Sequence, residues 1–164
     1  MSPTPPLLHI DIEHPLPGLS PAQCQQLVTA CGHALSQQAC PVGLSSDGWA
    51  ASIVLSDNET VQGLNRQFRG KDKPTNVLSF PTDAADWQPG EPPYLGDIIL
   101  ATETLSAEAE AQQKPVAHHL QHLVLHGLLH LWGYDHLTPA EAEIMETLEI
   151  SLLKALNIPD PYNY

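Results

Sequence analysis

Three histidines lie close together in residues 126–136, at a spacing that suits one metal ion. His126 and His130 are four residues apart, so on a helix both imidazoles project from the same face, one turn from each other. Gly133 can adopt the left-handed conformation that ends a helix, which lets His136 fold back over the helix end. Three protein ligands with a fourth position open is the arrangement of catalytic zinc sites. The spacing predicts one zinc ion per chain, held by His126, His130 and His136.

The same spacing, H-x-x-x-H-x-x-G-x-x-H, is typical of the metzincin peptidases, with one difference. Those enzymes carry a glutamate directly after the first histidine, where it serves as the general base. This chain has Gly127 there, and glycine can neither accept nor donate a proton. A zinc peptidase is therefore an alternative prediction that lacks its base.

No other residue is an obvious general base. His122, Asp97 and Asp135 are candidates, but each could instead have a structural role such as bracing a ligand histidine. Tyr134 is expected to serve packing. The sequence leaves the identity of the base open.

The chain is strongly acidic, with a formal net charge of −13, which disfavours general attraction to nucleic acid. Four of its six basic residues nevertheless fall within the segment RQFRGKDK, residues 66–73. This segment could form an anion site, or it could be a solvated helix end whose charges suit the helix dipole. The segment alone does not decide between the two.

The other segments predict the elements that must position these groups. Four short strands are expected, at 7–14, 49–56, 75–81 and 95–101. Five helices are expected, at 20–39, 57–70, 102–113, 115–133 and 138–157. The Pro-rich segment 81–95 is expected to be a loop and could act as a flap over a site. Strands and helices that mix without strict alternation predict a single α+β domain over 1–164, with a small mixed sheet packed on helices.

Two features concern the compartment. Cys24, Cys31 and Cys40 give an odd count without a C-x-x-C pair, so we expect free thiols, as in a reducing compartment. No segment approaches the ~20 apolar residues of a membrane span, and the N-terminus does not have the pattern of a secretory signal. We expect a cytoplasmic protein with no membrane partner.

Three blocks of the sequence together resemble the YbeY family of bacterial single-strand-specific endoribonucleases. They are HLVLHGLLHLWGYDH, the upstream LNRQFRGKDKPTNVLSFP and the intervening LGDIIL, in the family's order. The resemblance implies an α+β, zincin-like fold in which about five helices and a small sheet surround a central metal-bearing helix. It also implies zinc ligands at His126, His130 and His136 and a functionally important arginine at Arg69.

The resemblance further implies a metal-dependent hydrolase with Arg69 and His126 as catalytic residues. Arg69 would position the phosphate and stabilise the transition state, while Lys71 and Lys73 would hold the RNA backbone. The attacking group could be hydroxide generated at the metal or the neighbouring 2′-OH, and the sequence leaves both open. Because the chain has few aromatic residues, we expect binding to free RNA to be weak and strongly salt-dependent.

The implied biological role is maturation of the 16S rRNA 3′ end and ribosome quality control. The implied partners are single-stranded rRNA, the small ribosomal subunit, a small-subunit ribosomal protein and the GTPase Era. A second alternative is a non-catalytic ribosome-assembly factor in which the metal only stabilises the helix end.

Overall fold

The structure is a computed structural model that describes residues 6–37, 48–87 and 91–161. Its strands form one four-stranded sheet in the order β1-β2-β4-β3. The strands are β1 (Leu7–Ile12), β2 (Ala50–Ser56), β3 (Val77–Pro81) and β4 (Tyr94–Ala101). β1, β2 and β4 run parallel, whereas β3 pairs antiparallel with β4 and forms one edge. The predicted small mixed sheet is therefore confirmed.

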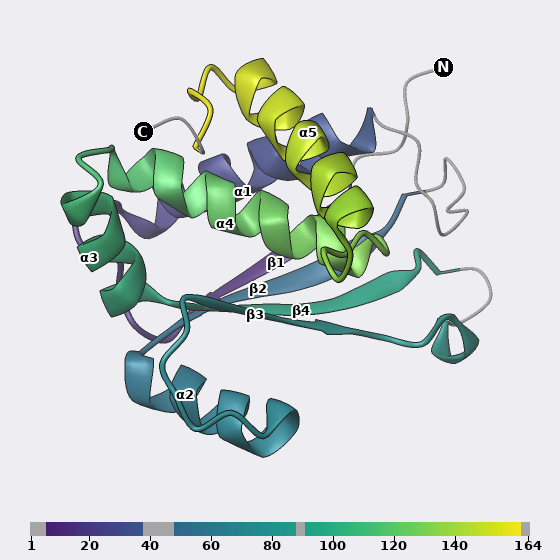
Figure 1. Ribbon diagram of the computed structural model, residues 1–164, viewed down its shortest axis with the longest axis horizontal. Helices are drawn as coiled ribbons and strands as arrows, with labels where there is room; N and C mark the ends of the chain where they lie inside the picture. The colour runs from purple at the N-terminus through teal and green to yellow at the C-terminus, as the bar shows by residue number, and fades with distance from the viewer. Residues whose placement is uncertain (1–5, 38–47, 88–90, 162–164) are drawn as a thin grey trace.

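Helices cover the two faces of this sheet unequally (Figure 1). On one face lie α1 (Pro21–Ser36), α4 (Val116–Leu131) and α5 (Pro139–Ala155). On the other face lies α2 (Asn58–Arg69), while α3 (Thr102–Ala111) stands at one end. The helix α4 is central because it packs against β3 and β4 as well as α1, α3 and α5. The fold is the α+β architecture with a central helix that the sequence and the resemblance predicted.

The helix ends follow the local sequence signals. Ser20 caps α1, because its hydroxyl accepts a 3.1 Å hydrogen bond from Gln23 N and its own N–H donates to the Gln23 side chain at 2.8 Å. Asp57 caps α2 by accepting from Thr60 N at 2.7 Å, and Gly70 ends that helix with a φ of 68°. Such ends explain why the predicted helix boundaries hold within a few residues.

The Pro-rich segment departs from a plain loop. It contains a short 3-10 helix, η1 (Ala84–Asp86), and β4 already begins at Tyr94. Residues 88–90 of this segment lie outside the described residues. Its role as a flap stays a prediction.

The core lies between the sheet and the three-helix layer. Trp49 and Trp132 meet edge to face there, with ring centroids 5.8 Å apart. Cys24 and Cys31 are buried free thiols, as predicted, while Cys40 lies outside the described residues. Among the helices of the described ranges, none combines the length and apolar character needed to cross a bilayer.

Candidate metal-dependent active site

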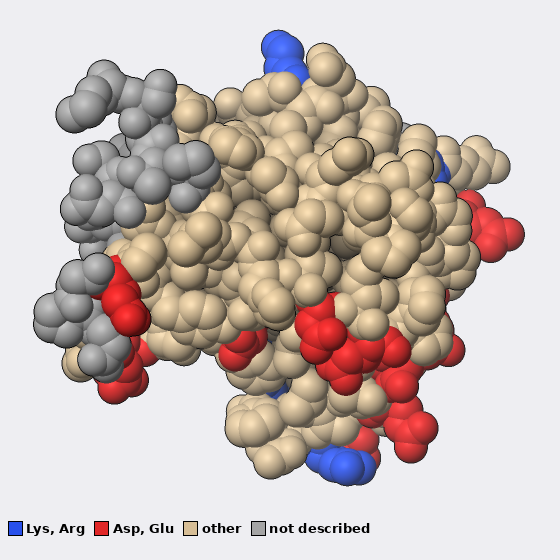
Figure 2. All heavy atoms as spheres, turned by 180° about the vertical axis from the view of Figure 1, so that it is seen from behind, with Lys and Arg blue, Asp and Glu red and all other residues tan. Residues whose placement is uncertain are grey.

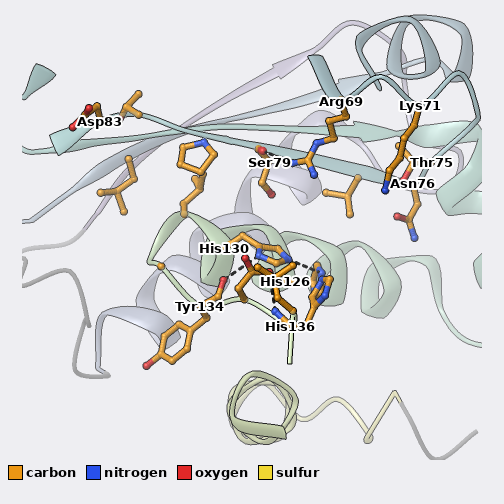
Figure 3. A pocket seen from close by; sticks show the side chains of 18 of the residues that line it. Arg69, Lys71, Thr75, Asn76, Ser79, Asp83, His126, His130, Tyr134 and His136 are labelled. Carbon is orange, nitrogen blue, oxygen red and sulfur yellow. Dashed lines mark hydrogen bonds between the residues drawn. The ribbon is translucent and has the colours of Figure 1, made fainter. Parts of the chain in front are cut away.

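The structure brings the three predicted histidines together at the C-terminal end of α4. His126 and His130 project from the helix, and His136 returns from the loop that follows it (Figure 3). The Nε2 atoms of His126 and His130 are 3.2 Å apart. Each histidine offers one ring nitrogen that lies within 4.8 Å of the other two. The left-handed turn that this return needs occurs at Gly133, whose φ is 102°.

In His126 and His130, the ring nitrogen that faces away from the cluster, Nδ1, has a hydrogen-bond partner that orients the ring. His130 Nδ1 lies 3.0 Å from the carbonyl oxygen of Tyr134, which can only accept, so Nδ1 donates and Nε2 keeps its lone pair. His126 Nδ1 lies 3.2 Å from a carboxylate oxygen of Glu149. Burial, reinforced by the neighbouring His126 and His136, lowers the pKa of His130, which favours the neutral form that binds metals.

The donor set fits a metal ion. Two nitrogens that each lie 2.0–2.1 Å from a tetrahedral zinc ion are separated by about 3.3 Å. The 3.2 Å between His126 Nε2 and His130 Nε2 matches this separation. His126, His130 and His136 could therefore hold one metal ion with a coordination position left for another group.

Gly127 follows His126 on α4 and lies against the sheet, facing Ile98 of β4. A Cβ built at Gly127 would stand 3.0 Å from two side-chain carbons of Ile98, which is fully buried on β4. At the position where the peptidases carry their catalytic glutamate, any side chain would therefore have to displace Ile98. This contact gives a structural reason why the peptidase alternative lacks its base.

A cavity of about 850 Å³ separates the histidines from the basic end of α2. Figure 3 shows Arg69 and Lys71 on the wall opposite His126, His130 and His136. Arg69 Nη2 donates a 2.9 Å hydrogen bond to the Ser79 carbonyl of β3. Of the predicted substrate-binding residues, the structure therefore places Arg69 and Lys71 in the cavity.

The third predicted RNA-binding residue, Lys73, does not line this cavity. It is exposed, and its carbonyl accepts a 3.0 Å hydrogen bond from Asn65 Nδ2. Lys71 before it and Thr75 after it both line the cavity, so Lys73 is directed away from a segment that otherwise borders the site, and spacing alone could not show this.

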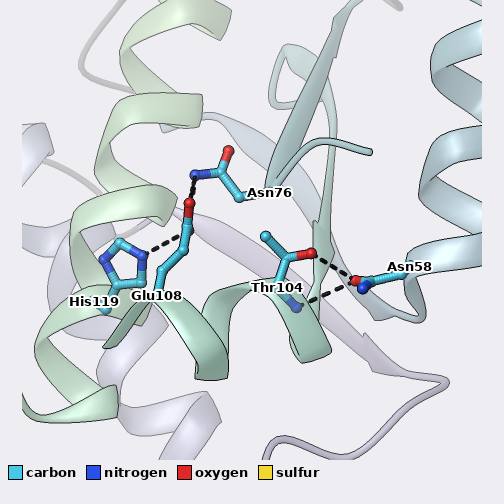
Figure 4. A network of polar contacts seen from close by, with 5 residues as sticks. All are labelled: Asn58, Asn76, Thr104, Glu108 and His119. Atoms are coloured by element: carbon cyan, nitrogen blue, oxygen red, sulfur yellow. Dashed lines mark hydrogen bonds and ion pairs between the residues drawn. The ribbon is translucent and has the colours of Figure 1, made fainter. Parts of the chain in front are cut away.

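A polar network fixes another part of the cavity wall (Figure 4). Asn76 lines the cavity, and its Nδ2 donates to Glu108 Oε1 at 3.1 Å. The same carboxylate oxygen lies 3.0 Å from Nε2 of His119, which is buried. Burial lowers the pKa of His119, although the hydrogen bond to Glu108 opposes this shift. The network anchors Asn76 to both α3 and α4.

The two aspartates that are candidate general bases differ in their position relative to the cavity. Asp97 accepts from the hydroxyl of Tyr94 and does not line the cavity. Its neighbour Ile98 faces α4, and successive strand residues point to opposite faces, so Asp97 is turned away from the histidines. Asp135 does line the cavity, where its carboxylate accepts a 2.8 Å bond from the backbone N–H of His136.

His122 is linked to the site indirectly, through a residue that the sequence analysis missed. His122 Nε2 lies 3.0 Å from Glu149 Oε1, the oxygen that also contacts His126. Burial alone would raise the pKa of Glu149, but the hydrogen bonds from His122 and His126 outweigh it and hold the pKa at about 2. One feature of the sequence could have revealed Glu149: it is a single acidic residue on the apolar stripe of α5, between Met145 and Leu152, which are both buried.

Charge is distributed unevenly over the surface. Figure 2 shows that Asp and Glu side chains gather on the side where α2 and α3 lie. This acidic surface would repel RNA phosphates, whereas Arg69 and Lys71 line the cavity of the histidines. The cavity thus carries Arg69 and Lys71 on the wall opposite the histidines, while Asp83 and Asp135 also line it.

An α+β domain with three convergent histidines facing an arginine belongs to the class of candidate metal-dependent hydrolases. The sequence comparisons narrow this class: a family model described as Endoribonuclease YbeY matches residues 18–157. The chain belongs to the YbeY family. This membership makes it one of a family of nucleases, which are hydrolases.

Individual relatives agree with the family model. Endoribonuclease YbeY of Paramagnetospirillum magneticum is 60% identical over 114 residues, covering 68% of this chain and 70% of that protein. Endoribonuclease YbeY of Rhodopseudomonas palustris (strain BisB5) is 53% identical over 117 residues, covering 68% of this chain and 60% of that protein. Endoribonuclease YbeY of Magnetococcus marinus is 51% identical over 128 residues, covering 70% of this chain and 87% of that protein.

A solved structure supports the fold. The solution structure of TM1509 from Thermotoga maritima superposes with a TM-score of 0.56 and covers 92% of both chains. At 20% sequence identity, this likeness concerns the architecture alone.

Proposed function

We propose that the chain is a zinc-dependent endoribonuclease that cleaves single-stranded RNA. The observation that carries the proposal is the placement of Arg69 across one cavity from His126, His130 and His136. Hydrolysis of a phosphodiester needs positive charge beside the reacting phosphate. Arg69 would provide it from one wall, and a zinc ion held by the histidines would provide it from the other. The relatives named as endoribonucleases support the same assignment.

The residues of the chain have separate tasks in this reaction. His126, His130 and His136 would hold the zinc ion, which when bound supplies a Lewis acid and an activated water near neutral pH. The guanidinium of Arg69 is planar and always charged, so it binds phosphate oxygens and stabilises the charge that grows on them. Lys71 attracts the phosphate backbone of the RNA toward the cavity. Asn76, on the cavity wall, offers the RNA a polar contact.

The biological role follows from the family resemblance. We propose that the substrate is ribosomal RNA near the 3′ end of 16S rRNA, with a role in ribosome quality control. The small ribosomal subunit, a small-subunit ribosomal protein and the GTPase Era are the proposed partners, in the cytoplasm. Delivery of the substrate by partners suits a chain whose net charge of −13 gives it little attraction for free RNA.

Cleavage of a labelled single-stranded RNA by the purified, zinc-loaded protein tests the proposal. His130→Ala and Arg69→Ala are compared with Arg66→Ala, a matched control on the same helix that does not line the cavity. We expect cleavage by the wild type and Arg66→Ala and none by the other two. Equal cleavage by all four proteins would identify a contaminating nuclease. If none cleaves free RNA, and Arg69→Ala leaves ribosomal RNA processing in cells unchanged, the assembly-factor alternative holds.

A further inference from the structure

Glu149 is a charged residue that the proposed chemistry does not use, yet it touches the site. It belongs to α5, and its side chain is completely buried. One carboxylate oxygen, Oε1, lies 3.2 Å from His126 Nδ1 and 3.0 Å from His122 Nε2. The carboxylate thus connects α5 to two successive turns of α4.

These contacts determine which nitrogen of His126 faces the metal position. An ionised carboxylate can only accept hydrogen bonds, so Nδ1 of His126 donates to it. Nε2 is then the nitrogen with a free lone pair, and it is the atom that lies 3.2 Å from Nε2 of His130. Without the carboxylate, the ring could rotate or adopt the other tautomer, in which Nε2 carries the proton and cannot bind a metal.

A structural role alone does not explain this placement. Burying a carboxylate is costly, and a buried ion pair is often no more stable than apolar side chains of similar volume. Met145 and Leu152, the buried neighbours on the same helix stripe, show that apolar residues suit this interface. A carboxylate at position 149 therefore needs a reason other than the packing of α5 on α4.

We propose that Glu149 is a positioning residue that orients His126 for metal binding, and that His122 holds the carboxylate in place through the same oxygen, Oε1. Carboxylates behind metal-bound imidazoles fix the ring and raise its basicity, and their loss weakens metal affinity about 10- to 100-fold. The inference rests on the metal site of the proposed function but not on RNA cleavage. Glu149 is not among the residues that line the cavity, so its effect on the metal position passes through His126.

The test measures zinc affinity without RNA, by competition with a chromogenic chelator. Glu149→Leu removes the acceptor, Glu149→Gln keeps one accepting oxygen but removes the charge, and Glu146→Gln is a matched control on the exposed side of α5. We expect Glu149→Leu to bind zinc 10- to 100-fold more weakly, Glu149→Gln to lie between it and the wild type, and Glu146→Gln to match the wild type. The visible spectrum of the cobalt-substituted protein should change in the same order, since it reports ligand geometry.

Circular dichroism and melting of the metal-free proteins separate a lost ligand orientation from a lost fold. Wild-type zinc affinity and an unchanged cobalt spectrum in a folded Glu149→Leu protein would overturn the inference. If that variant does not fold, nitrogen NMR of the zinc-loaded wild type decides: zinc bound through Nε2 of His126 with Nδ1 protonated supports the positioning role, and binding through Nδ1 refutes it. A wild type that binds zinc but does not cleave RNA would refute the proposed function alone, and one that binds no zinc would refute both.

Discussion

Arg69 Nη2 donates a 2.9 Å hydrogen bond to the carbonyl oxygen of Ser79, and this contact ties the last residue of α2 to the edge strand β3. Because β3 also packs against α4, the guanidinium is held at a defined position relative to the histidines. An arginine on a free helix end would have to be ordered by the substrate at an entropic cost. The bond to Ser79 therefore prepares the cation before RNA binds.

The first prediction concerns this arginine. Arg69→Ala should lower kcat for RNA cleavage about 100- to 1,000-fold, as expected when one charge-stabilising donor is removed from a transition state. Arg69→Lys should recover only part of the rate, because lysine keeps the charge but loses the planar fork. Zinc affinity should stay at the wild-type level in both variants, since Arg69 is not a ligand. A loss of zinc binding that parallels the loss of kcat would contradict this division of roles.

The second prediction concerns the close contact between α4 and β4. Gly127→Glu should lower the free energy of unfolding by about 1–3 kcal/mol or more, because the new side chain meets Ile98 in a packed interior. It should create no peptidase activity. Gly63→Glu is the matched control, since Gly63 is also helical but has no atom within 4 Å of its added Cβ. Urea denaturation of both variants and a casein digestion assay check the prediction, and a stable, proteolytic Gly127→Glu protein would contradict it.

The cluster of three histidines could be predicted from sequence because its residues are local. His126, His130 and Gly133 act within one helix and its end, where spacing and backbone preference determine geometry. Glu149 could not be found in the same way, because its contact with His126 joins two helices whose packing no local pattern specifies. Asp97 shows the opposite case: its residue type suited a base, but the direction of its strand position turned it away from the cavity.

The basic segment shows a similar limit. Its composition left open whether it forms an anion site or a solvated helix end, and the structure shows that Arg69 and Lys71 line the cavity with the histidines. Composition could not say where the chain turns after Gly70, so Lys73 was grouped with them although it lies outside the cavity lining. Charge clusters predict where positive charge gathers, whereas the fold decides which charges face the site.

The third prediction uses this difference between two lysines. Lys71→Ala should raise KM for single-stranded RNA and reduce the salt dependence of binding by about 0.7 in log–log slope, the value for one lost contact to a single strand. Lys73→Ala should change both quantities less. Binding titrations at several salt concentrations check the slopes. Equal effects of the two substitutions would show that the bound RNA extends beyond the cavity.

The fourth prediction concerns metal binding and stability. Zinc should raise the melting temperature, because a ligand that binds only the folded state stabilises it, by about 2.7 kcal/mol at a free concentration 100 times its Kd. His136→Ala should abolish most of this rise while it changes the stability of the metal-free protein by no more than about 0.5 kcal/mol, since His136 is exposed. His33→Ala, at an exposed position of α1, should behave like the wild type. Calorimetric titration should give one zinc ion per chain. If zinc raises the melting temperature of His136→Ala as much as that of the wild type, His136 is not a ligand.

The last prediction concerns pH and the buried network behind Asn76. Burial lowers the pKa of His119 in the folded state, despite its hydrogen bond to Glu108, whereas in the unfolded chain it titrates near 6.5. Between those two values unfolding takes up a proton, so the free energy of unfolding is largest above pH 6.5 and falls as the pH drops toward the folded pKa. The contribution of His119 to the pH dependence of the free energy of unfolding should reach at most about 1.4 kcal/mol per pH unit, and His119→Gln should remove this contribution. Urea denaturation of the metal-free wild type and His119→Gln between pH 7.5 and pH 5 measures this difference, and equal slopes would mean that His119 takes up its proton equally well in the folded protein.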